Sequence, residues 1–187
     1  MLRLVKLSLV AGLISITSLY AMSEQEAKQI AMDAIKTVGG TLKYILMQKA
    51  KEGGLTNAAT FCSTQAGNVA KTASKSLPKG VSVKRITDKP RNKMNQATPE
   101  QLKVLNEIKA NMKPNEKPQM VVKKISDNHY QVYKPLKVEK KCLNCHGGDD
   151  VRNKDAYNII AKKYPNDKAI GYNLGDFRGA FLVDIIK

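Results

Sequence analysis

The most restrictive feature of this 187-residue chain is a pair of cysteines with a histidine directly behind them, Cys142-Leu143-Asn144-Cys145-His146. Two thiols three positions apart can add to the two vinyl groups of a haem as thioethers, and the adjacent imidazole can then reach the iron. The pattern therefore predicts one covalently attached haem c, held through Cys142 and Cys145, with His146 as an axial iron ligand.

Three other interpretations use the same residues. A thioredoxin-like redox pair needs its first cysteine at a helix N-terminus, but Gly147-Gly148 directly after the motif disfavours a helix that continues. A zinc site needs a second ligand pair, and the three cysteines and two histidines of the chain leave only Cys62 and His129. A plain disulfide leaves the histidine without a role. So few soft ligands also exclude a multi-haem chain, a zinc-finger array and a dense disulfide framework.

The residues alone leave the second axial ligand open between Cys62, His129, a methionine, a lysine, water and no ligand. His129 follows Asp127-Asn128 at a predicted turn and is first interpreted as a surface histidine. Cys62 lies on the apolar face of a predicted helix. A buried structural cysteine is the first interpretation of that position, and an iron ligand is the second.

Residues 1–21 have the pattern of a secretory signal peptide. Arg3 and Lys6 precede the apolar run Leu7–Ile16, and Ala21 is a small residue at a plausible cleavage site. We therefore expect export to the periplasm and a mature single c-type haem domain over residues 22–187. No later segment approaches about 18 consecutive apolar residues, so we expect no integral membrane span in the mature chain. In an oxidising compartment an idle third thiol would be at risk of oxidation or cross-linking.

The charge is strongly positive, with 32 Lys+Arg against 16 Asp+Glu and a formal net charge of +16. Only five of the basic residues are arginine, and the lysines are spread along the chain. Nucleic-acid-binding surfaces tend to cluster arginine and interleave aromatic residues, so we expect no nucleic-acid partner. A solvated lysine surface is the first interpretation, and docking onto an acidic redox partner or anionic lipid headgroups is the second.

Helix and turn signals divide the chain into helices followed by strands. Capping boxes at Ser23 and Thr98 predict the starts of two helices. Gly53-Gly54 should end the first helical stretch, and a second helix should carry Cys62. Alternating apolar residues predict strands over 81–86, 120–125, 130–136 and 180–186, with a short helix over 155–163. The order of these elements predicts an α+β fold.

Four stretches of the sequence follow one another in a specific order: Phe61-Cys62-Ser63, the loop Lys84–Asn92, Tyr133-Lys134-Pro135-Leu136 leading to the cysteine motif, and Gly171-Tyr172 with Gly175–Ala180. In these stretches and their order the chain resembles the Tll0287-like haem domain family, whose members are c-type haem proteins. The resemblance implies a PAS-like antiparallel sheet with long N-terminal helices and a covalently bound haem. It also implies that Cys62 is the second axial ligand, opposite His146. One departure is Lys93, where the family often has proline.

This resemblance favours a redox or gas sensor module with a separate, unknown signalling partner. The alternative is a low-potential periplasmic electron-transfer cytochrome, because a thiolate ligand favours ferric iron and the lysine surface suits an acidic redox protein. An enzyme would need distal acid–base groups at an open iron site, and only His129 is spare, so we do not expect one. Arg85 and Arg91 are candidates for pairing with the haem propionates.

Overall fold

The computed structural model describes residues 22–113 and 116–187. It has an α+β fold, as predicted, with a long N-terminal helical stretch and a four-stranded antiparallel sheet. The predicted signal peptide, residues 1–21, lies outside the described residues. Within the described ranges, no helix is both long and apolar enough to cross a bilayer. The elements, in order, are α1 (Glu24–Ile35), the π-helical turn η1 (Lys36–Gly40), α2 (Thr41–Thr64), α3 (Ala66–Ser74), β1 (Val81–Ile86), the 3-10 turn η2 (Lys93–Asn95), α4 (Pro99–Ala110), β2 (Val121–Ser126), β3 (His129–Lys137), the 3-10 turn η3 (Lys140–Cys142), α5 (Leu143–His146), α6 (Lys154–Lys163) and β4 (Phe177–Ile186).

The strands lie in the order β1-β4-β3-β2, and every neighbouring pair is antiparallel. The hairpin of β2 and β3 confirms the predicted strand pair. The last strand starts at Phe177, three residues earlier than the alternating pattern indicated. Gly179 permits this extension: it has φ +90°, and a Cβ atom there would lie 2.3 Å from the backbone oxygen of Ile86. A glycine in a strand often marks such a close approach of two backbones.

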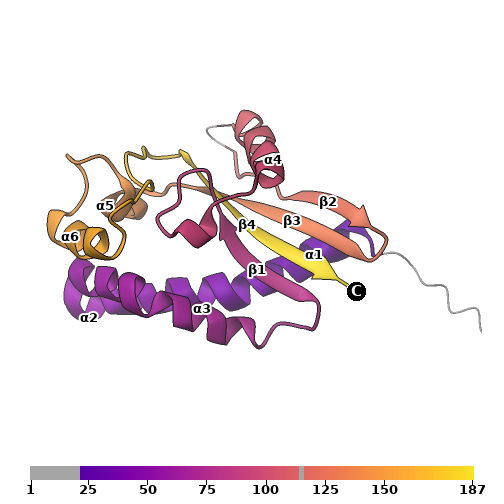
Figure 1. Ribbon diagram of the computed structural model, residues 1–187, viewed down its shortest axis with the longest axis horizontal. Helices are drawn as coiled ribbons and strands as arrows, with labels where there is room; N and C mark the ends of the chain where they lie inside the picture. The colour runs from indigo at the N-terminus through magenta and orange to yellow at the C-terminus, as the bar shows by residue number, and fades with distance from the viewer. Residues whose placement is uncertain (1–21, 114–115) are drawn as a thin grey trace, which may run out of the picture.

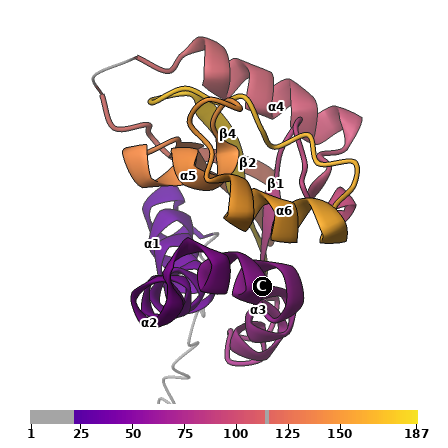
Figure 2. The ribbon, with the colours of Figure 1, turned by 90° about the vertical axis from the view of Figure 1, so that its left-hand side faces the viewer.

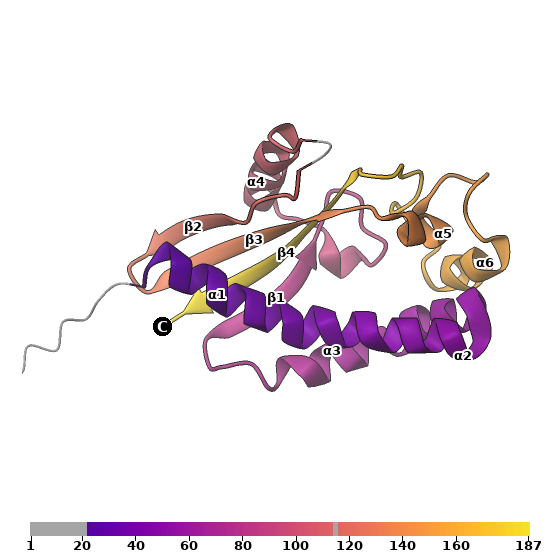
Figure 3. The same cartoon turned by 180° about the vertical axis from the view of Figure 1, so that it is seen from behind.

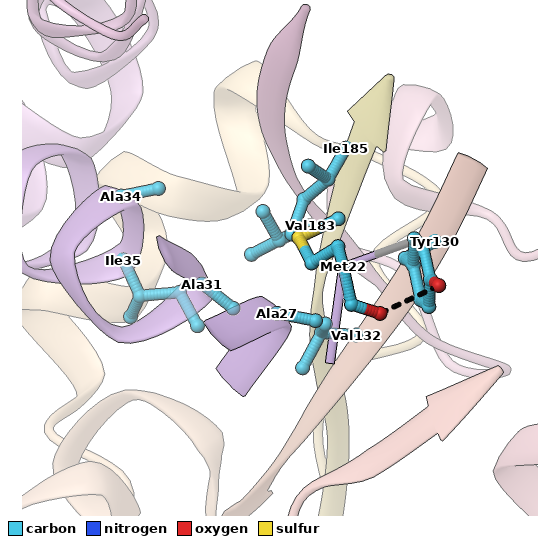
Figure 4. Packing of buried hydrophobic residues seen from close by; sticks show 9 residues of the cluster. All are labelled: Met22, Ala27, Ala31, Ala34, Ile35, Tyr130, Val132, Val183 and Ile185. Carbon is cyan, nitrogen blue, oxygen red and sulfur yellow. Dashed lines mark hydrogen bonds between the residues drawn. The ribbon is translucent and has the colours of Figure 1, made fainter. Parts of the chain in front are cut away.

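The two faces of the sheet are covered by different helices (Figure 1). Successive residues of a strand point to opposite faces, so β4 sends Val183 toward α1 and Leu182 toward α4. On the α1 face, small alanines let the helix approach the sheet closely, and the hydroxyl of Tyr130 donates to the carbonyl oxygen of Met22 at 2.7 Å (Figure 4). This core cluster consists of Met22, Ala27, Ala31, Ala34, Ile35, Tyr130, Val132, Val183 and Ile185.

The N-terminal helices form a long antiparallel pair (Figure 3). The Ser23 capping box begins α1 as predicted, and Gly39 in η1 lets the helix pass the ring of Phe181, which a Cβ atom would meet at 2.8 Å. The predicted break occurs inside α2, where Gly54 has φ +69° and ψ −165°. The second half of α2 then runs back and packs against α6. This return brings the middle of the chain to the segment that follows β3.

The cysteine motif lies at the end of the sheet opposite the chain's C-terminus (Figure 1). Viewed from that end, α5 and α6 lie above the turn of α2 (Figure 2). Because β3 leads directly into η3 and α5, the sheet positions the motif, and the second half of α2 lies across from it.

Candidate functional site

The cysteine motif forms a single helical turn. Cys142 ends η3, and α5 runs only from Leu143 to His146. Gly147 then turns extended (ψ −172°), and a Cβ atom there would lie 2.8 Å from the backbone oxygen of Leu143. The prediction that no helix continues through Gly147-Gly148 is confirmed. The first cysteine therefore lacks the long helix behind it that a thioredoxin-like pair uses to lower a thiol pKa.

His146 is held as a neutral imidazole with one nitrogen left over. Its Nδ1 lies 2.6 Å from the carbonyl oxygen of Ala169, which can only accept, so Nδ1 carries the proton. Burial is the largest cause that lowers the pKa of His146 to about 2, and the positive charges of Arg91, Arg178 and Arg85 act in the same direction. The lone pair is therefore on Nε2, which is the state of histidine that binds a metal.

A buried ion pair fixes the surroundings of this histidine. Arg91 donates from Nη2 to the carbonyl oxygen of Cys145 at 2.6 Å, and that nitrogen lies 3.2 Å from Nδ1 of His146. Its Nε pairs with Asp167 at 2.9 Å, and the other carboxylate oxygen of Asp167 accepts from the backbone N–H of Ala169 at 2.8 Å. Asp167, whose side chain is only 1% exposed, thus holds both Arg91 and the carbonyl partner of His146.

Asp167 was missed in the sequence. It stands in a polar loop with no spacing relation to the motif, so no local signal could have found it. Arg91 was predicted as a propionate candidate, and in the structure its Nε and Nη2 atoms bind Asp167 and the motif backbone.

The structure brings Cys62 to the motif. Cys62 lies on the returning half of α2, one turn after Ala59, which packs with α6 and with Cys145. Burial, followed by the neighbouring Cys145, raises the pKa of the Cys62 thiol to about 11, while Arg91 acts in the opposite direction. Cys62 therefore shares its surroundings with Cys145 and Arg91, although it is far from both in sequence. All three cysteines are free thiols.

Two other candidate ligands lie elsewhere. His129 begins β3 at the far end of the sheet and is half-buried, with Nε2 2.9 Å from Asp184. The prediction of a surface histidine in a turn is thus only partly right, because the strand starts one residue earlier and gives the ring a carboxylate partner. Met94 is 87% exposed. In the described ranges no three His, Cys, Asp or Glu side chains come together as a metal-binding group, so an all-protein zinc site has no ligand set there.

Three further arginines near the motif have buried Nε atoms without hydrogen-bond partners among the described residues: Arg85 on β1, Arg152, and Arg178 on β4. Arg152 pairs with Asp149, whereas Arg85 and Arg178 have no ion-pair partner among the described residues. Burial, followed by the charge of Arg178, lowers the pKa of Arg85 to about 10. Burial is also the main cause that lowers the pKa of Arg178. A buried guanidinium without an anion is costly, so these residues fit a bound group that carries carboxylates. Arg178 was not predicted as a site residue, although it stands in the stretch Gly175–Ala180.

The loop before β4 completes the site. The backbone N–H of Tyr172 donates to the carbonyl oxygen of His146 at 3.0 Å, and the two rings meet edge to face with centroids 6.4 Å apart. Lys89 lies over the Tyr172 ring at 4.4 Å and donates to the carbonyl oxygen of Ile170. The site thus combines two thiols, a neutral imidazole, a third thiol near Cys145 and several partly buried arginines.

Comparisons with known proteins identify the family of the chain. No curated protein matches the chain. A solved structure, described as the crystal structure of the cyanobacterial heme-protein Tll0287, shares the fold with a TM-score of 0.60. It is 24% identical, and the match covers 89% of this chain and 98% of that chain. A family model described as Tll0287-like matches residues 14–185. Since this match spans nearly the whole sequence, the chain belongs to the Tll0287-like family.

Proposed function

We propose that this chain is a c-type haem protein that carries one haem on Cys142 and Cys145, with His146 and Cys62 as the axial ligands. The observation that carries the proposal is the state of His146. Its Nδ1–H donates to the carbonyl oxygen of Ala169 at 2.6 Å, so the lone pair of Nε2 is available to bind a metal. The two cysteines of the same motif are free thiols. The similar solved structure is that of a heme-protein, which supports the same cofactor here.

A bound haem would supply one-electron redox chemistry and an iron coordination position. The chain's own part is to hold the ligands and their protons. Nε2 of His146 stays unprotonated because Arg91 and burial oppose a second positive charge on the ring. Sγ of Cys62 would have to give up its proton to bind as a thiolate. Burial of Cys62 disfavours a negative charge on Sγ, so a thiolate there would depend on the positive charge of a bound iron. If that positive charge were lowered, Sγ would take its proton back.

We propose a redox or gas sensor module as the role, because the candidate ligand Cys62 lies on a helix segment that a backbone break separates from the long N-terminal helix. Gly53 and Gly54 separate the returning half of α2 from the long N-terminal helix. A change in the bonding of Cys62 would alter how this half packs against α6. A signalling partner would read that change.

A low-potential electron-transfer cytochrome is the second candidate, and the net charge of +16 favours it through docking onto an acidic redox protein. In either role the protein would be exported to the periplasm and would not be an enzyme. The PAS-like character of the sheet stays a prediction of the family resemblance.

Covalent attachment is tested on protein made with its leader in a bacterium that matures c-type cytochromes. We expect an intact mass increased by one haem and a pigment that acid-acetone extraction does not remove. A Cys142→Ala, Cys145→Ala variant should lose the covalent pigment. Colourless wild-type protein, or pigment that acid-acetone removes, would refute the proposal.

The second ligand is tested by low-temperature EPR of the oxidised holoprotein. Cys62→Ser should change the spectrum, whereas Ser63→Ala, the adjacent buried residue on the same helix, should not. An unchanged Cys62→Ser spectrum would rule out thiolate ligation. CO added to the reduced protein then separates the roles: a structural change favours the sensor, and rapid electron exchange without one favours the carrier.

A further inference from the structure

We propose that Arg85 and Arg178 form a paired guanidinium site that binds the two carboxylates of the haem, and that Arg91 instead positions His146. The inference rests on the proposed function. It assigns to Arg178 a binding role that the sequence did not reveal. It also separates the two residues predicted together, Arg85 and Arg91, because their surroundings in the structure differ.

The first step is that the guanidinium groups of Arg85 and Arg178 have no carboxylate partner in the described residues. In the part of the chain that the structure describes, neither Arg85 nor Arg178 takes part in an ion pair, whereas Arg91 pairs with Asp167 and Arg152 with Asp149. Arg85 lies over the ring of Phe181 at 5.4 Å. Arg178 has one long contact, Nη1 to the hydroxyl of Thr87 at 3.5 Å.

The second step is that the two guanidinium groups lie together and beside the motif. Their strands are hydrogen-bonded neighbours, with Arg85 opposite Phe181 and Ile86 opposite Ala180. Arg178 lies over the ring of Tyr172, with Cζ 5.2 Å from the ring centroid. Its charge acts on Arg85, and both charges act on His146. Arg85 additionally interacts with Cys142. An anion bound by both arginines would therefore lie close to the porphyrin that these motif residues would hold.

The third step concerns the source of the anion. Guanidinium groups bind carboxylates through paired, charge-assisted hydrogen bonds. A small oxyanion from solvent, such as phosphate, has the same chemistry but would have to lose its water to reach two buried Nε atoms. Cys142 would hold a haem covalently and so keep its carboxylates in the protein without free diffusion, and we therefore assign the site to them. The other charged or titratable groups that face this pair are Asp88, Lys89, Arg91, Cys142, Asp167 and Tyr172.

The test is the pH dependence of the reduction potential of the holoprotein, measured by optical titration. Arg178→Gln and Arg85→Gln should each raise the pKa of a haem carboxyl group by about one to three units, because that carboxylate loses the positive charge beside it. The potential of each variant should then show an additional pH dependence between about 5 and 8 that the wild type lacks. Arg178→Lys keeps a positive charge and should restore most of the wild-type behaviour. Lys84→Gln, an equal charge change at the exposed neighbour on β1, should behave as wild type.

Two results would overturn the proposal. The first is the same pH dependence in wild type, Arg178→Gln and Arg85→Gln. The second is calorimetric binding of inorganic phosphate to wild-type holoprotein that Arg178→Gln abolishes, because the site would then take an anion from solvent. Intact mass is recorded for every sample. If wild-type protein carries no haem, the proposed function itself fails. The intact mass detects that case and so distinguishes it from the two results above.

Discussion

Replacement of Asp167 by asparagine tests whether one buried carboxylate organises the site. Asp167 pairs with Arg91 while the two side chains are only 1% and 13% exposed. Removal of one partner from a buried ion pair costs about 3–5 kcal/mol, because the other charge stays buried without compensation. Asparagine keeps an oxygen for the backbone N–H of Ala169, so we expect the lower end, about 3 kcal/mol.

In a protein of this size, that loss should lower the melting temperature by about 6–12 °C, at about 2–4 °C per kcal/mol. Thermal unfolding followed by circular dichroism measures the shift. Glu107→Gln is the matched control, because it breaks the exposed pair with Lys123, whose side chains are 60% and 40% exposed. Exposed pairs contribute about 0–1 kcal/mol.

A second readout separates a positioning role from a purely structural one. In the haem-loaded protein, Asp167→Asn should shift the EPR spectrum, because the carbonyl of Ala169 that orients His146 loses its anchor. Glu107→Gln should leave the spectrum unchanged. If Asp167→Asn melts no lower than Glu107→Gln and has the wild-type spectrum, the role assigned to this carboxylate is wrong.

Three further predictions concern His146, two glycines with positive φ, and the start of α4. The pKa of His146 is lowered from 6.5 to about 2, so its contribution to stability is present above pH 6.5 and is lost as the pH falls. In haem-free protein, urea unfolding should show a loss of about 1.4 kcal/mol per pH unit below 6.5 from this residue, and His146→Gln should lack it; equal slopes would contradict the buried neutral ring. Gly179→Ala should cost more than about 3 kcal/mol, because a strained φ is combined with a backbone clash. Gly54→Ala, at a strained φ and ψ but in open space, should cost about 1–3 kcal/mol, less than Gly179→Ala. Thermal melts that rank the two glycines equally would refute the comparison. Thr98→Ala should cost about 1 kcal/mol through loss of the capping box on α4, checked by chemical denaturation.

Local chemistry explains which parts of the fold could be predicted. The capping boxes at Ser23 and Thr98 and the break at Gly53-Gly54 depend on backbone groups within a few residues, and all three occur as predicted. The early start of β4 was missed because a glycine interrupts the alternating pattern. That position extends the strand only because it faces the backbone of Ile86, which no local pattern reveals.

The site divides in the same way. Cys142, Cys145 and His146 lie within five residues, so the chain itself keeps the two thiols and the imidazole close together. They could therefore be recognised without a structure. The family resemblance added Cys62, and the return of α2 along α6 brings that thiol to the motif.

The amino-acid sequence determined the helices, the strands and the haem-attachment motif, because each depends on neighbours close along the chain. Only the tertiary structure decided that Asp167 and Arg91 form the surroundings of His146. It also decided that Arg85 and Arg178 have buried Nε atoms without a hydrogen-bond partner in the described part of the chain. The physical reason is that hydrogen bonds and charges act over a few ångströms of space. The residues that share such a volume here come from β1, the loops before α4 and β4, and the start of β4 itself.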